Sequence, residues 1–175
     1  KNSQKQKGID WTVPCTDITD KPQFAWRGLM LDVSRHWFTK EEVKKYIDEL
    51  AEYKMNVFHW HLTDDQGWRL EIKSLPRLTE VGAWRAPRVG QWWQRAPQQP
   101  GEETTYGGFY TQEDVKEVLA YAAERYVRVI PEIDVPGHSL AALVAYPDLA
   151  CMKAPSAVGV GNKFYGEDEN TLCVG

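Results

Sequence analysis

The sequence has few cysteines, no long apolar run and no excess of basic residues. Its 175 residues include three cysteines, and because none of them forms a Cys-x-x-Cys pair, a zinc ribbon and a thioredoxin-type site are excluded. The longest apolar runs are a handful of residues, too short for a segment that crosses a membrane. Lysine and arginine total 21 against 25 acidic residues, a net charge of −4, which argues against a nucleic-acid partner.

The three cysteines leave two possibilities open. Cys151 and Cys173 could close a loop by a disulfide, which would suit an oxidising compartment. Three free thiols, including Cys15, fit the sequence equally well. The sequence alone does not choose between these two states.

Aromatic residues, in contrast, are abundant. The chain has eight tryptophans and eight tyrosines within an apolar content of 42%, enough for a packed core. Tryptophan most often anchors a core or an interface. A flat indole face also matches the apolar face of a sugar ring or a base, and composition does not decide between these uses.

Short apolar runs alternate with helical patterns along the chain. Runs at residues 28–33, 56–62 and 127–133 predict buried strands. Helices are predicted after Thr39 and after Thr111, because each is followed three residues later by an acidic residue that completes a capping box. The stretch from Leu75 to about Gly108 is predicted to be a long irregular loop, and the tail from Ala154 to Gly175 is also predicted to be loop-like.

This alternation predicts an α/β fold with a parallel sheet. No glycine-rich nucleotide motif follows any strand, which favours a (β/α)8 TIM barrel over a doubly wound sheet. A complete barrel needs about 250 residues and eight strands, so this chain is expected to supply about the first three strands. Residues 1–24 are predicted to be a linker or the tail of a preceding domain, and residues 25–175 the N-terminal part of the barrel.

Polar, reactive residues follow each predicted strand, at the end where TIM barrels place their active sites. After the second run, His59 and His61 are expected on one face of the strand, where they could be metal ligands or structural residues. Asp64 and Asp65 follow directly, and one of them can face the mouth of the barrel. An aspartate beside a histidine commonly orients the imidazole and stabilises its charge.

The third and first runs add further candidates. Glu132 and Asp134 share a face and are either a pair of catalytic carboxylates or ion-paired interior residues. A Pro-Gly turn follows and can return His138 toward the mouth. Arg35, just after the first strand, suits vicinal hydroxyls or a carboxylate, or an ion pair with Asp64 or Asp134.

Taken in order, three segments resemble glycoside hydrolase family 20, the β-N-acetylhexosaminidases. They are RGLMLDVSRH at 27–36, NVFHWHLTDDQGWR at 56–69 and PEIDVPGH at 131–138. The resemblance runs from about Phe24 to Gly175. It implies a (β/α)8 barrel that removes terminal, non-reducing β-linked GlcNAc or GalNAc with retention of configuration, without a cofactor or a metal.

The resemblance also implies roles for individual residues. Arg35 would hold the hydroxyls at C3 and C4 of the terminal sugar. Asp64 and His138 would form a hydrogen-bonded pair that supports the acid catalyst, while His59 and His61 would be structural. The 2-acetamido oxygen of the substrate would attack the anomeric carbon and form an oxazolinium intermediate, so no enzyme nucleophile is needed.

The chain departs from the family pattern at one point. The family's Asp-Glu pair, which orients the acetamido group and protonates the leaving oxygen, sits in a Gly-Gly-Asp-Glu-like motif on the fourth strand and is expected beyond the end of this chain. The acidic residues Glu167, Asp168 and Glu169 are not assigned that role. The chain alone is therefore expected to be inactive.

Partners and location follow from the same resemblance. We expect glycans that contain N-acetylhexosamine and the remainder of the barrel as partners, no nucleic acid and no membrane, and a periplasmic or secreted location by analogy with the family. Two other functions remain open: a metal-dependent hydrolase using His59, His61 and His138, and a non-catalytic carbohydrate-binding fragment.

Overall fold

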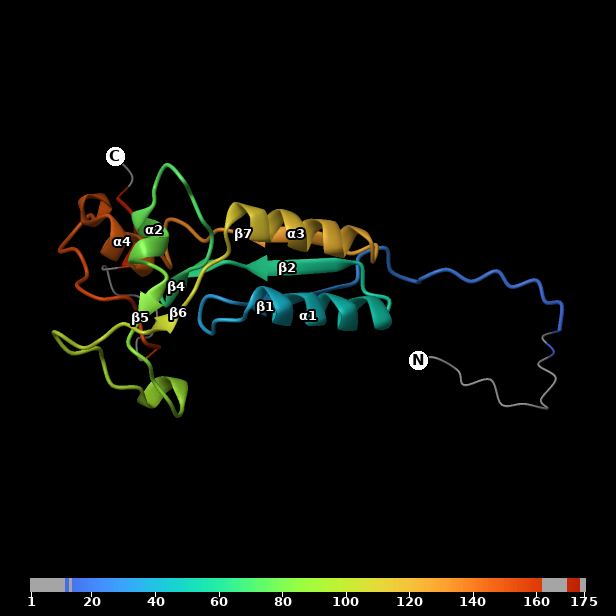
Figure 1. Ribbon diagram of the computed structural model, residues 1–175, viewed down its shortest axis with the longest axis horizontal. Helices are drawn as coiled ribbons and strands as arrows, with labels where there is room; N and C mark the ends of the chain where they lie inside the picture. Colours follow the sequence, from blue (N-terminus) through green and yellow to red (C-terminus); the bar gives the residue numbers. More distant parts are fainter. Residues whose placement is uncertain (1–11, 13, 162–169, 174–175) are drawn as a thin grey trace.

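The centre of the fold is a parallel sheet of three strands (Figure 1). The computed structural model describes residues 12, 14–161 and 170–173. Its sheet has the order β1 (Gly28–Asp32), β2 (Val57–His61) and β7 (Arg128–Glu132). All three predicted apolar runs are therefore strands, and their parallel pairing agrees with the predicted α/β class.

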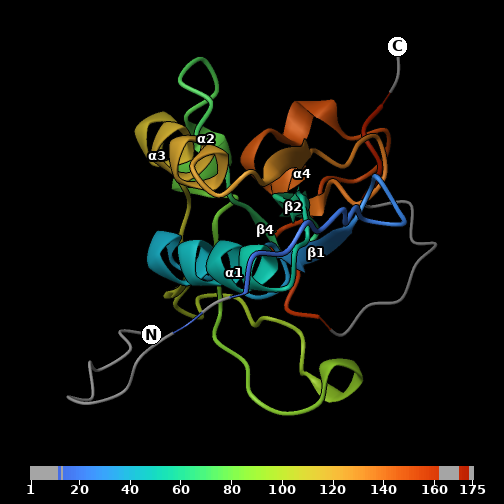
Figure 2. The same cartoon turned by 90° about the vertical axis from the view of Figure 1, so that its right-hand side faces the viewer.

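Helices α1 (Lys40–Glu52) and α3 (Gln112–Ala123) connect these strands and lie next to each other along the sheet (Figures 1 and 2). Both begin at the predicted capping boxes, where the side chains of Thr39 and Thr111 accept the backbone N–H of the acidic residue three positions later, and the side chain of that acidic residue accepts the backbone N–H of the threonine. These reciprocal bonds satisfy amide groups that have no partner within the helix.

The main core lies between the two helices and one face of the sheet. Phe58 and Trp60 of β2 are buried there against Val43 and Ile47 of α1 and Val118 of α3. The intervening residues of β2 face the other way, as the period of two requires. The register then aligns Asp32, His61 and Glu132 in one row across that opposite face.

Short elements gather at the carboxyl ends of the three strands, on the left of Figure 1. They are β3 (Thr63–Asp64), β4 (Gly67–Trp68), α2 (Arg77–Glu80), β5 (Trp84–Arg85), η1 (Trp92–Gln94), β6 (Tyr106–Gly107), α4 (Leu140–Ala145) and η2 (Pro147–Leu149). The predicted irregular loop at 75–108 thus contains a helix and the antiparallel pair β5–β6. Strands of two residues are too short to leave a periodic signal, which is why the sequence did not predict them.

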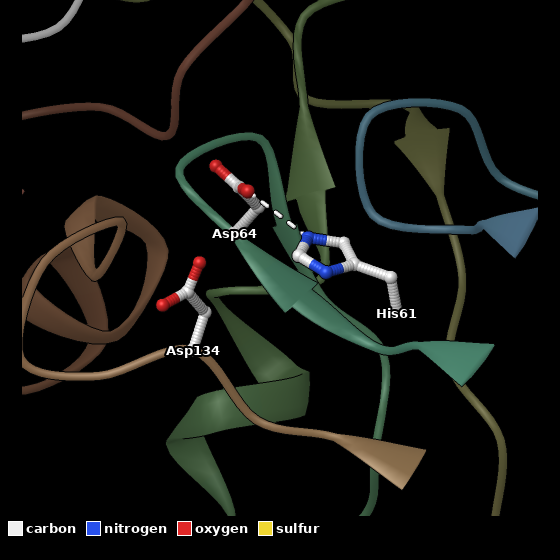
Figure 3. A group of neighbouring side chains, drawn as sticks. All are labelled: His61, Asp64 and Asp134. Atoms are coloured by element: carbon white, nitrogen blue, oxygen red, sulfur yellow. Dashed lines mark hydrogen bonds and ion pairs between the residues drawn. The ribbon is translucent and has the colours of Figure 1, made fainter. Parts of the chain in front are cut away.

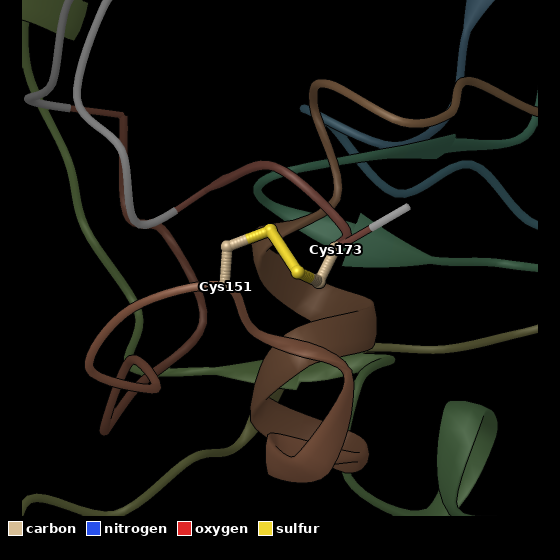
Figure 4. Close-up of a disulfide and its surroundings, with 2 residues drawn as sticks. All are labelled: Cys151 and Cys173. Atoms are coloured by element: carbon tan, nitrogen blue, oxygen red, sulfur yellow. A yellow bond between two sulfur atoms is a disulfide. The ribbon is translucent and has the colours of Figure 1, made fainter. Parts of the chain in front are cut away.

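A disulfide joins Cys151 to Cys173, whose Cα atoms are 4.5 Å apart (Figure 4). Of the two open possibilities, the structure therefore has the paired one, and Cys15 is free and exposed. Glu167, Asp168 and Glu169 lie outside the described residues. Among the helices that are described, none has the length and apolar character needed to cross a membrane. The boundary predicted at residue 24 stays a prediction.

Candidate active site

Asp64 is the centre of a network of charged residues at the carboxyl ends of the strands. Its side chain is fully buried. One carboxylate oxygen lies 2.6 Å from Nη2 of Arg35 and 3.0 Å from Nε2 of His61. The other oxygen lies 3.1 Å from Nδ1 of His138 and accepts the backbone N–H of Asp65 at 2.7 Å.

These four neighbours determine the charge of Asp64. Burial opposes its ionisation, but the hydrogen bonds from His61 and the Asp65 amide, with the charges of Arg35 and His138, hold the pKa of the carboxyl below its usual value. Asp64 is therefore an anion that is fully enclosed by donors. Of the two consecutive aspartates, Asp64 contacts Arg35, His61 and His138, and Asp65 lies 4.0 Å from Nδ1 of His138.

Arg35 is held between two carboxylates. Its guanidinium lies 2.7 Å from Asp32 and 2.6 Å from Asp64, so the ion pair with Asp64 that the sequence left open is present. Asp32 also accepts the backbone N–H groups of Ser34 and Arg35 with its other oxygen. About a quarter of the Arg35 side chain (28%) is exposed, whereas the Asp64 side chain is fully buried.

His61 lies between two carboxylates as well. Nε2 is 3.0 Å from Asp64 and Nδ1 is 2.8 Å from Glu132 (Figure 3 shows the contact with Asp64). Burial disfavours the charged ring, but these two hydrogen bonds outweigh it and raise the pKa of His61 to about 9. His59 reaches the same Glu132 oxygen at 2.5 Å, which confirms that the two histidines share a face.

His138 is turned back toward Asp64 by the backbone that follows β7. Val135–Pro136 is a cis peptide bond, and His138 itself has a left-handed conformation with φ of 54°. The predicted pairing with Asp64 is thus present in the geometry, while the catalytic role of the pair stays a prediction. Asp65 accepts the N–H of Leu140 at 3.1 Å and so holds the beginning of α4, directly after His138.

The structure groups possible metal ligands differently from the predicted set of three histidines. In the part of the chain that is described, the groups are His61 with Asp64 and Asp134 (Figure 3), and Asp64 with Asp65 and His138. Both depend on Asp64, whose oxygens already accept from four donors, one of them a guanidinium. A cation would have to displace these donors, so the donor set does not favour a metal.

Two buried arginines were not singled out from the sequence. The side chains of Arg69 and Arg85 are almost entirely enclosed, at 0% and 2% exposure. Because arginine is mostly exposed in proteins, nothing in a single sequence indicates such burial. Arg69 contacts the carbonyl of Ser34, and Arg85 contacts the carbonyl of Arg35.

Comparison with known proteins decides the family. The model of the glycosyl hydrolase family 20 catalytic domain matches residues 24–175. The chain belongs to glycosyl hydrolase family 20. A beta-hexosaminidase of Vibrio furnissii is 55% identical over 141 residues, and one of Porphyromonas gingivalis is 47% identical over 167 residues.

Solved structures of family 20 enzymes agree with this assignment. A mutant Streptomyces plicatus beta-hexosaminidase in complex with the product GlcNAc has a TM-score of 0.72 and 44% identity, and the match covers 88% of this chain and 27% of that one. The predicted fold class is confirmed: the chain is α/β and supplies three strands of a (β/α)8 barrel. The chain spans about a fifth of the length of these two curated relatives. The match with the Porphyromonas protein covers 95% of this chain and 19% of that protein, and the match with the Vibrio protein covers 81% of this chain and 22% of that protein.

Proposed function

We propose that this chain is part of a retaining exo-glycosidase that releases terminal, non-reducing β-linked N-acetylhexosamine. The observation that carries the proposal is the joint position of Arg35, Asp64 and His138, which come from the ends of three different strands and meet through Asp64. Catalytic residues from several strand ends are typical of TIM-barrel enzymes. Relatives named beta-hexosaminidase at 47–55% identity support the substrate class.

Arg35 binds the sugar in this proposal. A guanidinium presents parallel N–H donors that match two neighbouring hydroxyls, here those at C3 and C4 of the terminal sugar. The ion pairs with Asp32 and Asp64 restrict its orientation before the sugar arrives. Binding then requires little loss of side-chain freedom, which favours affinity.

Asp64 and His138 support the acid catalyst. The carboxylate of Asp64 accepts from Nδ1 of His138, which fixes the orientation of the imidazole ring. The acid catalyst is the glutamic acid that protonates the leaving oxygen, expected on a fourth strand together with the aspartate that orients the acetamido group. A pair that is fixed in this way tunes the pKa of the acid for proton transfer.

The reaction proceeds with help from the substrate. The acetamido oxygen forms a bond to the anomeric carbon as the glycosidic bond breaks, and the leaving oxygen takes the proton of the acid. Water then attacks the anomeric carbon of the oxazolinium intermediate as the bond between that carbon and the acetamido oxygen breaks, and a proton of the water passes to the conjugate base of the acid. Two displacements at one carbon give overall retention.

The test uses the full-length protein that contains this chain. It should hydrolyse a nitrophenyl N-acetyl-β-glucosaminide and leave the corresponding β-glucoside, which has no acetamido group, unchanged. The Arg35→Gln variant should lose about 100-fold in kcat/KM, because two charge-assisted hydrogen bonds are removed. Equal hydrolysis of both substrates would overturn the proposed mechanism, and activity abolished by a chelator would favour the metal-dependent alternative.

We also propose that the protein is exported to the periplasm or secreted. The disulfide between Cys151 and Cys173 supports this proposal, because disulfides persist mainly in oxidising compartments. Fractionation of the native cells, with the hexosaminidase activity as the marker, tests it. Activity confined to the cytoplasm would contradict it.

A further inference from the structure

The backbone that carries Arg35 is held by two buried guanidinium groups. Arg69 donates from Nε to the carbonyl of Val33 at 3.1 Å and from Nη2 to the carbonyl of Ser34 at 2.7 Å. Arg85 donates from Nη2 to the carbonyl of Arg35 at 3.2 Å. Three consecutive carbonyls of the turn after β1 therefore accept from a buried arginine.

The N–H groups of the same turn are also bonded. The N–H of Val33 donates to the carbonyl of His61 at 3.2 Å, and those of Ser34 and Arg35 donate to Oδ1 of Asp32 at 3.0 Å each. Every backbone polar group of the turn thus has a partner. A backbone held at so many points has few alternative conformations.

Arg69 uses all five of its N–H donors, and every acceptor is a backbone carbonyl. These carbonyls belong to Val33, Ser34, Gln66, Ala83 and Gly108. The guanidinium fits because Gly67 has no side chain, since a Cβ there would lie 2.2 Å from Cζ of Arg69. One side chain therefore ties the turn after β1 to β4 and to the β5–β6 pair.

Arg85 contacts the same segment and also Tyr106. Its guanidinium lies 4.3 Å from the ring centre of Tyr106. The hydroxyl of Tyr106 accepts the backbone N–H of Trp37 at 3.1 Å and is 3.0 Å from Nδ1 of His36. Arg85 and Tyr106 together hold the residues at 35–37.

Neither buried arginine is paired with a carboxylate among the residues that are described. Burial lowers the pKa of both groups to about 10, which shows the cost of keeping a charge there. Groups that serve only to fill a core would be more stable as apolar side chains. Three of their carbonyl partners, those of Val33, Ser34 and Arg35, lie on the segment that presents Arg35.

We propose that Arg69 and Arg85 are positioning residues for sugar binding, which act by fixing the turn at 33–35 and thereby the guanidinium of Arg35. The inference rests on the proposed function, because it assumes that Arg35 binds the terminal sugar. Neither residue touches the substrate. Their effect passes through Arg35 alone.

The test is a double-mutant cycle in the full-length enzyme, with Arg85→Lys and Arg35→Gln made singly and together. Lysine keeps the charge of residue 85 but cannot reproduce the flat fork that reaches the Arg35 carbonyl. Arg85→Lys alone should raise KM about tenfold for the nitrophenyl N-acetyl-β-glucosaminide and change kcat little. In the Arg35→Gln background the same change should have no further effect on kcat/KM, because the group that it positions is gone.

Arg88→Lys is the matched control, since Arg88 lies in the same segment and pairs with Glu102 instead. It should leave KM unchanged. Independent, multiplicative losses for Arg85→Lys and Arg35→Gln would overturn the inference. If Arg85→Lys does not fold, Tyr106→Phe takes its place in the cycle, because it removes only the hydroxyl that holds residues 36 and 37 and should show the same dependence on Arg35.

The two proposals fail differently in this experiment. Wild-type kcat/KM in Arg35→Gln would refute the role of Arg35 itself, and with it the proposed function. A large loss in Arg35→Gln together with additive losses in the cycle would refute only the positioning role of the buried arginines.

Discussion

At the scale of single residues, the site is a chain of alternating charges. Arg35 contacts Asp64, Asp64 contacts His61, and His61 contacts Glu132. Each charge has an opposite charge within hydrogen-bond distance, which reduces the cost of holding so many ionised groups in one place. Removal of one member takes one partner away from each of its neighbours, so single substitutions here affect both charge and geometry.

Asp64→Asn and His138→Ala should each lower kcat of the full-length enzyme by about 100-fold or more, because the acid catalyst loses its support. Both variants should keep the fold, since the main core does not contain either residue. Steady-state kinetics and circular dichroism check the two parts of this prediction. Wild-type rates in both folded variants would contradict the assigned roles.

His61 should give the stability a dependence on alkaline pH. Its pKa is about 9 in the folded protein against 6.5 in the reference state, so its contribution is fully present below about pH 6.5 and is lost as the pH rises to about 9. The melting temperature of the full-length protein should therefore fall more between pH 6.5 and 9 than that of His61→Gln. Parallel falls in both proteins would show that His61 is not charged.

At the scale of elements, the strand ends bring the candidate residues together and the short elements hold them. β1, β2 and β7 run parallel, so their carboxyl ends lie at one edge and the segments after them meet there. The disulfide ties Cys151, two residues after η2, to the segment 170–173, and Leu172 donates its backbone N–H to the carbonyl of Pro136, near His138. The disulfide is thus linked to the site through this segment.

Loss of the disulfide should destabilise this region. Cys173→Ser should lower the free energy of unfolding by about 3 kcal/mol, as expected for a loop of this length, whereas Cys15→Ser should have no effect because Cys15 is exposed and free. Alkylation of the unreduced, denatured protein followed by peptide mapping should label Cys15 alone. Labelling of Cys151 and Cys173 would contradict the pairing.

At the scale of the whole molecule, the sheet has two open edges. The order β1-β2-β7 leaves the outer sides of β1 and β7 unpaired within the described structure. Leu29 and Met30 of β1 are each half exposed, at 49%. Unpaired strand edges with apolar residues readily pair with other chains, and further strands of a barrel would cover them.

The isolated 175-residue chain should therefore associate with itself through its open strand edges and should not hydrolyse the nitrophenyl substrate. The full-length protein should not associate through these edges and should hydrolyse the substrate. Light scattering coupled to size exclusion and an activity assay check this expectation. Calorimetric binding of GlcNAc by the isolated chain without turnover would favour a carbohydrate-binding fragment. A monomeric, active chain would contradict the need for further strands.

The sequence by itself determined the features that depend on neighbouring residues. Apolar runs predict the three strands, the capping boxes at Thr39 and Thr111 predict where the two helices begin, and three motifs in order indicate the family. These signals are local because strand pleat, helix period and capping act over a few residues. Arg35, Asp64 and His138 could be proposed on the same basis, since each follows a predicted strand.

Only the tertiary structure decided which groups meet. His61 lies between Asp64 and Glu132, and Arg69 and Arg85 are buried against the turn of Arg35, because segments far apart in the chain converge at one edge of the sheet. Charge state, burial and hydrogen-bond partners follow from these distant contacts. A single sequence contains no periodic trace of these contacts. The sequence could therefore predict which residues lie near Asp64, but not which of them bond to one another.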